Sequence, residues 1–185
     1  MRTRVPAPAP HPDYGSWCAE LLSAGDWHGL YQAAMRWRIA GGGSFTPDAW
    51  LMDVGSALLH RQPKTAVHCC DLALTTWVER PADRLVLRHL RGLLIADHVG
   101  DPARALDDLT AAATDGPDWL RDRARDDLDR VRADAGRSRV RTPRVGPSPE
   151  FDPQHRSPVA PPEEPWPEDG ARPPMWDVLA PLLAG

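Results

Sequence analysis

Apolar residues recur along residues 13–135 with the spacing of an α-helix. They stand three or four positions apart, which places them on one face of a helix. Turn sequences interrupt the pattern, and each is followed by an aspartate or a proline, the residues favoured at helix starts. We therefore predict an all-α region. The predicted helices begin near Asp13, Asp26, Pro47, Pro63, Pro81, Pro102 and Asp118.

Two of the predicted helices differ from the rest. The helix that begins at Pro81 is apolar almost all round, so we expect it to lie centrally with neighbours on both sides. The helix at 118–135 has one narrow apolar stripe, and Asp and Arg fill most other positions. They include the i, i+4 pair Asp126 and Arg130 and the i, i+3 pair Asp127 and Arg130. This helix is predicted to cap the end of the array. Between helix pairs, the run from Gly41 to Ser44 is expected to be a flexible loop.

The pattern stops at Gly136, and the composition changes to Pro, Ser, Arg and Glu. We divide the chain into a flexible N-terminus (1–12), a helical domain (13–135), a linker predicted to be disordered (136–172) and a short docking segment (173–185). Twelve of the 21 prolines lie between Pro143 and Pro181, and Pro181 is expected to kink or break a helix there. The predicted docking residues are Met175, Trp176, Leu179, Leu182 and Leu183.

The helix pairs turn at Gly25-Asp26-Trp27, Gln62-Pro63-Lys64 and Gly100-Asp101-Pro102. After the third turn, small, large apolar, small and proline residues follow at the places where tetratricopeptide repeats have them: Ala105, Leu109, Ala112 and Pro117. Residues 13 to 117 thus resemble a degenerate tetratricopeptide array. The resemblance implies an α-solenoid of about three helix pairs plus a cap, with a groove for a peptide or helix. We expect Trp17, Trp50 and Leu90 to line that groove.

Charge and cysteine content narrow the function classes. The chain has 26 acidic and 22 basic residues, so its net charge of -4 gives no general reason to bind nucleic acid. Its 21 arginines and single lysine match the coding bias of a GC-rich bacterial genome. Three cysteines form no even framework, which favours a reducing cytoplasm. No apolar stretch is long enough for a secretory signal or a membrane span. We predict a soluble cytoplasmic protein.

The strongest candidate for chemistry is His68-Cys69-Cys70. Adjacent cysteines on a helix point about 100° apart, so both do not readily face one metal ion. Cys70 also falls on the apolar stripe, as a small buried residue would. A metal protein or enzyme centred on this cluster remains an alternative. We predict no enzyme activity, no cofactor and no metal, because no nucleophile or phosphate-loop motif is present.

The leading interpretation is a non-catalytic adaptor or scaffold that binds another protein in its groove. The docking segment is expected to bind either this groove or a second protein, and the sequence leaves both open. The alternative is a regulatory protein associated with nucleic acid. It would use four closely spaced arginines for phosphate contacts: Arg137, Arg139, Arg141 and Arg144.

Overall fold

The structure, a computed structural model, describes residues 13–40, 42–137, 168 and 170–183. This part of the chain is helical and contains no strand. Short 3₁₀ or π segments lie at Gly43–Phe45 (η1), Ala73–Trp77 (η2) and Leu94–Val99 (η3). The eight α-helices are α1 (Tyr14–Ser23), α2 (Trp27–Ala40), α3 (Pro47–Leu59), α4 (Pro63–Leu72), α5 (Pro81–Leu93), α6 (Pro102–Asp115), α7 (Asp118–Arg137) and α8 (Pro174–Leu183).

The predicted helix starts are confirmed, and their chemistry is visible. Asp13 and Asp101 each accept a hydrogen bond of 3.1 Å from a backbone amide three residues later. Asp26 accepts one of 2.8 Å from Gly29 N. These carboxylates satisfy amides that have no partner inside the helix. Prolines occupy the first turn of α3, α4, α5 and α6, where their missing N–H is no loss.

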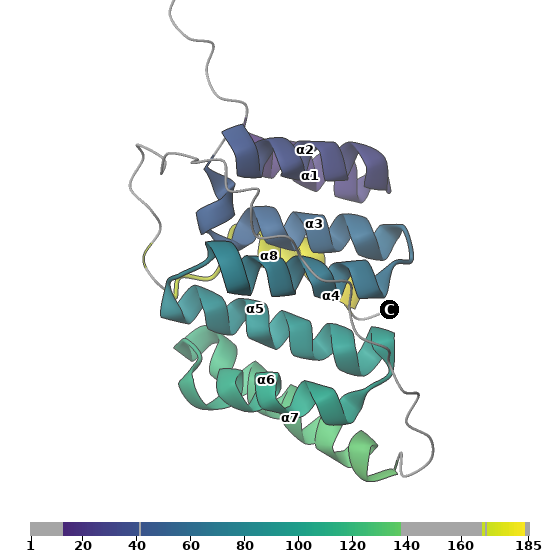
Figure 1. Cartoon of the computed structure of the whole chain (residues 1–185), viewed down its shortest axis with the longest axis vertical. Coiled ribbons are helices and arrows are strands. Elements are labelled where there is room, and N and C mark those ends of the chain that lie inside the picture. Colours follow the sequence, from purple (N-terminus) through teal and green to yellow (C-terminus); the bar gives the residue numbers. More distant parts are fainter. Residues whose placement is uncertain (1–12, 41, 138–167, 169, 184–185) are drawn as a thin grey trace, which may run out of the picture.

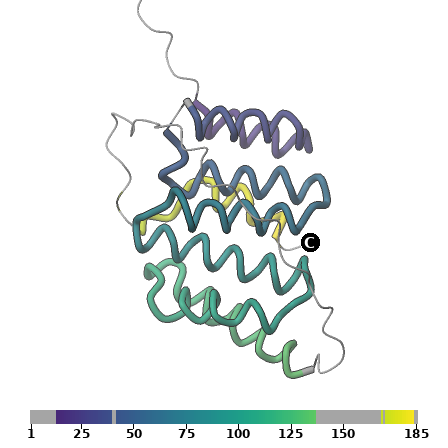
Figure 2. The backbone as a smooth tube through the Cα atoms, viewed as in Figure 1, coloured from purple at the N-terminus to yellow at the C-terminus, as the bar shows by residue number. Residues whose placement is uncertain are grey.

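The helices stack in chain order, as Figure 1 shows: α1 and α2 lie at one end, then α3 and α4, then α5, with α6 and α7 at the other end. The central place predicted for α5 is confirmed, but the helix is not apolar all round, because one face carries Arg84, Arg88 and Arg91. In the view of Figure 2, α8, drawn in yellow, overlaps the region of α3, α4 and α5 although it is the last helix in sequence. It packs mainly against α3 and also against α1.

Most buried apolar residues form one cluster that runs from α1 to α7 and includes α8. A smaller cluster contains Trp50, Ala73, Leu74, Val78 and Leu87. Trp50 was predicted to line a groove, and this is corrected: it is fully buried in the smaller cluster. Its Nε1 donates to the Ser44 carbonyl at 2.9 Å, and the Arg38 guanidinium lies 4.3 Å from its ring centroid.

Two local predictions were wrong. The expected loop before α3 is instead a packed 3₁₀ turn in which Gly43 and Ser44 are buried. A Cβ on Gly43 would lie 2.7 Å from the Trp37 ring, so the close approach needs glycine. Pro181 does not break α8, which continues to Leu183. Because Pro181 lies in the last turn, the missing N–H removes one hydrogen bond near an end that already frays.

The end of the predicted helical domain also moves. Helix α7 continues to Arg137, two residues beyond the predicted domain end. Residues 138–167, most of the predicted linker, lie outside the described part, as do residues 1–12. None of the described helices combines the length and the hydropathy that a membrane crossing requires.

Candidate functional site

The main feature of the molecule is the contact between α8 and the body of the same chain. Trp176 and Leu179 are fully buried, and Met175 and Leu183 keep less than a tenth of their surface exposed. Leu182 is half-buried. The predicted docking residues therefore lie on the chain's own helices. We call the surface beneath them the docking face and define it by six residues of α1, α3, α5 and α7: Gly15, Asp48, Gly55, His89, Trp119 and Arg123.

Trp176 is the anchor of α8. Its ring centroid lies 5.5 Å from that of His89 on α5 and 5.9 Å from that of Trp119 on α7, with the two indoles at 65°. The Arg123 guanidinium lies 5.7 Å from the Trp176 ring. Edge-to-face aromatic pairs and cation–π contacts each contribute about 1 kcal/mol beyond the burial itself. A single side chain thus connects α8 to two further helices besides its main partner α3.

The first turn of α8 is held by a carboxylate of α3. Asp48 Oδ1 accepts a hydrogen bond of 2.9 Å from the backbone N of Met175. The amide has no partner within its own helix, and the positive end of the helix dipole favours a negative group there. Burial raises the pKa of Asp48, while the bond from Met175 opposes this rise. Asp48 therefore favours the N-terminus of a bound helix at this point of the docking face.

Small residues let α8 approach the body closely. A Cβ on Gly55 of α3 would lie 3.3 Å from a methyl of Leu179, and one on Gly15 of α1 would lie 3.6 Å from Met175 Cε. The contact also starts earlier than the predicted boundary at residue 173. Trp119 Nε1 donates to the Gly170 carbonyl at 2.8 Å. The segment that contacts the body among the described residues is therefore 170–183.

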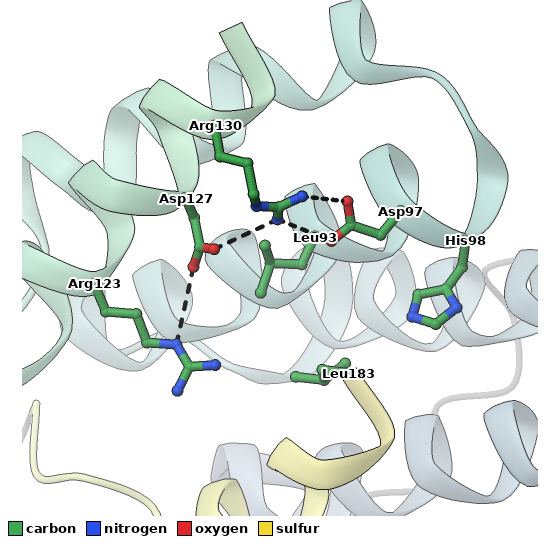
Figure 3. A pocket seen from close by; sticks show the side chains of 7 residues that line it. All are labelled: Leu93, Asp97, His98, Arg123, Asp127, Arg130 and Leu183. Carbon is green, nitrogen blue, oxygen red and sulfur yellow. Dashed lines mark hydrogen bonds and ion pairs between the residues drawn. The ribbon is translucent and has the colours of Figure 1, made fainter. Parts of the chain in front are cut away.

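A pocket of about 450 Å³ opens where α8 ends. Figure 3 shows its walls, which carry two acidic and two basic side chains above Leu183 of α8. We call it the end pocket, and it is lined by Leu93, Asp97, His98, Arg123, Asp127, Arg130 and Leu183.

The charged groups of the end pocket bond mainly to one another. Arg130 donates to both oxygens of Asp97 at 2.7 and 2.9 Å, and it donates to Asp127, one of its two predicted partners, at 3.4 Å. Asp127 Oδ2 lies 3.0 Å from His89 Nε2. Burial raises the pKa of Asp127, but the bond to His89 and the nearby arginines outweigh burial and leave the pKa lowered. These bonds hold α7 on α5 and η3, and through His89 they also support Trp176.

The other predicted site residues have different outcomes. Leu90 is fully buried in the cluster that contains the apolar residues of α8, and Trp17 packs against that cluster. The arginine cluster falls outside the described part, apart from the backbone of Arg137 at the end of α7. Its role in phosphate binding stays a prediction.

The environments of the cysteines oppose thiol chemistry. Burial raises the pKa of Cys18 and of Cys69 to about 12, with the charge of Asp53 adding to both. Burial likewise raises the pKa of Cys70 well above its usual value. Since the thiolate is the nucleophile and the metal ligand, thiols that stay protonated at neutral pH are poorly suited to either role. His68 is exposed while Cys70 is buried, so the two do not share one environment. Within the described residues, no three His, Cys, Asp or Glu side chains are placed to hold a metal.

Asp48 and Gly55 were missed as site residues. Both carried a signal, because each interrupts the apolar pattern of the helix that begins at Pro47. A glycine in the middle of a helix lowers its stability by about 1 kcal/mol relative to alanine, and it usually marks a close approach of another element.

Comparisons of the chain with protein-family models, with curated proteins and with solved structures found no match.

Proposed function

We propose that this chain is a non-catalytic adaptor that binds an amphipathic helix of a partner protein on its docking face. In this proposal the helical stack is a tetratricopeptide-like solenoid, and the docking face is its groove. The observation that carries the proposal is α8 itself. An amphipathic helix far away in sequence lies on this face with Trp176 fully buried.

The contacts of α8 have the features of a bound helical ligand. Its anchors Trp176, Leu179 and Leu183 are spaced i, i+3 and i+7, the pattern by which helices bind in grooves. Its first turn meets a carboxylate, and its close approach depends on glycine. A partner helix that binds the docking face through the same contacts as α8 carries a large aromatic residue near its N-terminus and leucines on the same face.

In the absence of a partner, α8 occupies the face. Thirty-two residues lie between Arg137 and Gly170 and connect α8 to the body. A ligand segment joined to its site in the same chain has a high effective concentration, on the order of millimolar for short linkers. A partner helix must therefore bind more tightly than α8 does, or α8 must be weakened before the partner binds.

The test compares the full chain with a full-length Trp176→Ala variant. A labelled synthetic peptide of residues 170–183 is titrated into each, and binding is followed by fluorescence anisotropy. Truncating a buried tryptophan to alanine costs about 3–5 kcal/mol, so α8 of the variant competes weakly. We expect the peptide to bind the variant at least about tenfold more tightly than the wild-type chain.

Two controls accompany this test. A Val178→Ala chain changes a half-buried residue of the same helix and should leave the peptide affinity within about threefold of wild type. A peptide that carries Trp176→Ala should not bind either chain. If circular dichroism shows that the Trp176→Ala chain loses most of its helicity, and not only the helicity of α8, then α8 is a fixed part of the core and the proposal is wrong.

A further inference from the structure

A second pocket lies away from the docking face, between α2, the C-terminal half of α3, and α4. Its volume is about 300 Å³. Trp27 and Tyr31, one turn apart on α2, form one wall and are 38% and 43% exposed, which is unusual for such large side chains in this fold. The His60 ring stacks on Trp27 with centroids 3.8 Å apart and planes at 17°. We call this site the aromatic pocket.

Asp53 provides the only carboxylate among the described residues that line the aromatic pocket. It is 3% exposed, and its Oδ2 lies 2.8 Å from Arg38 Nε. Its Oδ1 is buried and has no hydrogen-bond partner in the described structure. A buried carboxylate oxygen without a donor is costly, and buried polar atoms are normally paired. One oxygen of Asp53 is therefore without a hydrogen-bond donor.

The same fold shows how a buried aspartate is satisfied elsewhere. Asp108, 5% exposed, accepts bonds from two arginines: Arg88 Nε at 2.9 Å, and Arg91 Nε and Nη2 at 2.6 and 2.8 Å. Both of its oxygens are used. Asp53 has one arginine where Asp108 has two, and the aromatic pocket lies beside it.

The contacts of Arg38 indicate which group fits. Its guanidinium lies 4.3 Å from the Trp50 ring centroid while its Nε pairs with Asp53. A guanidinium combines these two contacts because it is planar, stacks on aromatic rings and carries several N–H donors. An ammonium has a less suitable shape for stacking, and a quaternary ammonium has no donor for Oδ1.

We propose that the aromatic pocket binds an arginine side chain of a partner polypeptide, with the guanidinium against Trp27 and Tyr31 and an N–H directed to Asp53. Within the described lining there is no lysine or arginine to pair with the α-carboxylate of free arginine. An arginine in a peptide has no such charge. The net charge of -4 also favours a basic partner. This site is independent of the docking face, so its test does not depend on the fate of α8.

The test uses the isotope-labelled full chain and NMR titration with N-acetyl-arginine-N-methylamide. One side chain in a pocket binds in the millimolar range, where a Kd of 1 mM corresponds to about −4 kcal/mol. We expect saturable shifts confined to the Trp27 indole and to amides near Asp53 and Cys69. The citrulline analogue, which has nearly the same shape but no charge, should bind at least fivefold more weakly. Equal binding of the citrulline analogue, or shifts that map elsewhere, would overturn the proposal.

The variants Trp27→Ala and Tyr31→Ala should each weaken binding at least fivefold. Both side chains are partly exposed, so the fold tolerates their loss. The matched control is Ile39→Ala, which removes a 63% exposed apolar residue of the same helix outside the pocket and should change nothing. An equal loss in Ile39→Ala contradicts a specific site. Tighter binding of free arginine than of the blocked form would overturn the assignment to a polypeptide.

Discussion

At the scale of single residues, buried acids divide the molecule into well-paired and poorly paired sites. Asp108 is held by two arginines, whereas Asp53 has only Arg38. Burial raises the pKa of Asp53 to about 6, although the charge of Arg38 opposes this rise. The fold therefore maintains a buried carboxylate whose charge is poorly compensated, and this has a measurable effect on stability.

We predict that Asp53 makes stability fall as pH rises from about 4 to about 6. The folded chain holds this proton more tightly than the unfolded chain, for which the ordinary value is 3.8. The contribution of Asp53 protonation to the stability of the folded chain is thus full below pH 4 and is lost above pH 6. At about 1.4 kcal/mol per pKa unit, the change is at most about 3 kcal/mol. Urea unfolding of wild type and Asp53→Asn at several pH values measures it, and parallel curves for the two proteins would contradict it.

At the scale of elements, α8 differs from α1–α7 in what decides its place. The helices of the body follow one another through short turns, so each packs on the next. For α8 the place is decided by a match of shape, in which Leu179 lies over Gly55 and the first turn of α8 meets Asp48. A side chain that fills the space above Gly55 should therefore destabilise the docked position of α8 more than it destabilises α3, the helix that carries the glycine.

We predict that Gly55→Leu releases α8. The new side chain would overlap Leu179 and Leu22, and overpacking of this kind costs about 1–3 kcal/mol. Amide hydrogen exchange in residues 175–183 should become roughly tenfold faster or more. The control is Gly136→Leu on α7, where a Cβ meets nothing within 4 Å and exchange in α8 should be unchanged. Equal exchange of α8 in the two variants would show that Gly55 has no role in docking.

At the scale of the whole molecule, α8 connects the two ends of the stack. It bonds to Asp48 on α3 at its first turn, and through Trp176 it contacts α5 and α7. Its removal uncovers residues of four helices at once, α1, α3, α5 and α7. The energetic effect should therefore extend beyond the helices nearest to α8.

We predict that deletion of residues 170–185 lowers the melting temperature and creates a surface that binds the dye ANS. Exposed contiguous apolar surface of this kind marks binding sites. A separate peptide of residues 170–183, added to the truncated chain, should return the melting temperature and the ANS binding toward those of wild type. Arginine binding in the aromatic pocket should be unchanged, because no residue of 170–183 lines that pocket. An unaltered melting temperature without ANS binding would contradict a bridging role for α8.

Much of the body was predictable, because its information is local. Caps such as Asp13 and Asp101 and the prolines at helix starts act within one turn, and the apolar stripe of α7 is buried as its spacing indicates. The candidate site was less accessible to prediction. The apolar spacing of Trp176, Leu179 and Leu183 indicated that this segment docks, but spacing carries no information about the surface it meets.

By itself the sequence determined which segments are helical and which faces of them are apolar, because hydrogen bonding, capping and burial act on neighbours three or four residues apart. Only the tertiary structure decided that α8 lies on its own chain, that Trp50 belongs to a separate cluster, and that Asp53 is buried beside Trp27. These facts depend on which faces meet across long stretches of chain. Shape and charge complementarity between segments distant in sequence decide which faces meet, and no local sequence pattern encodes this pairing.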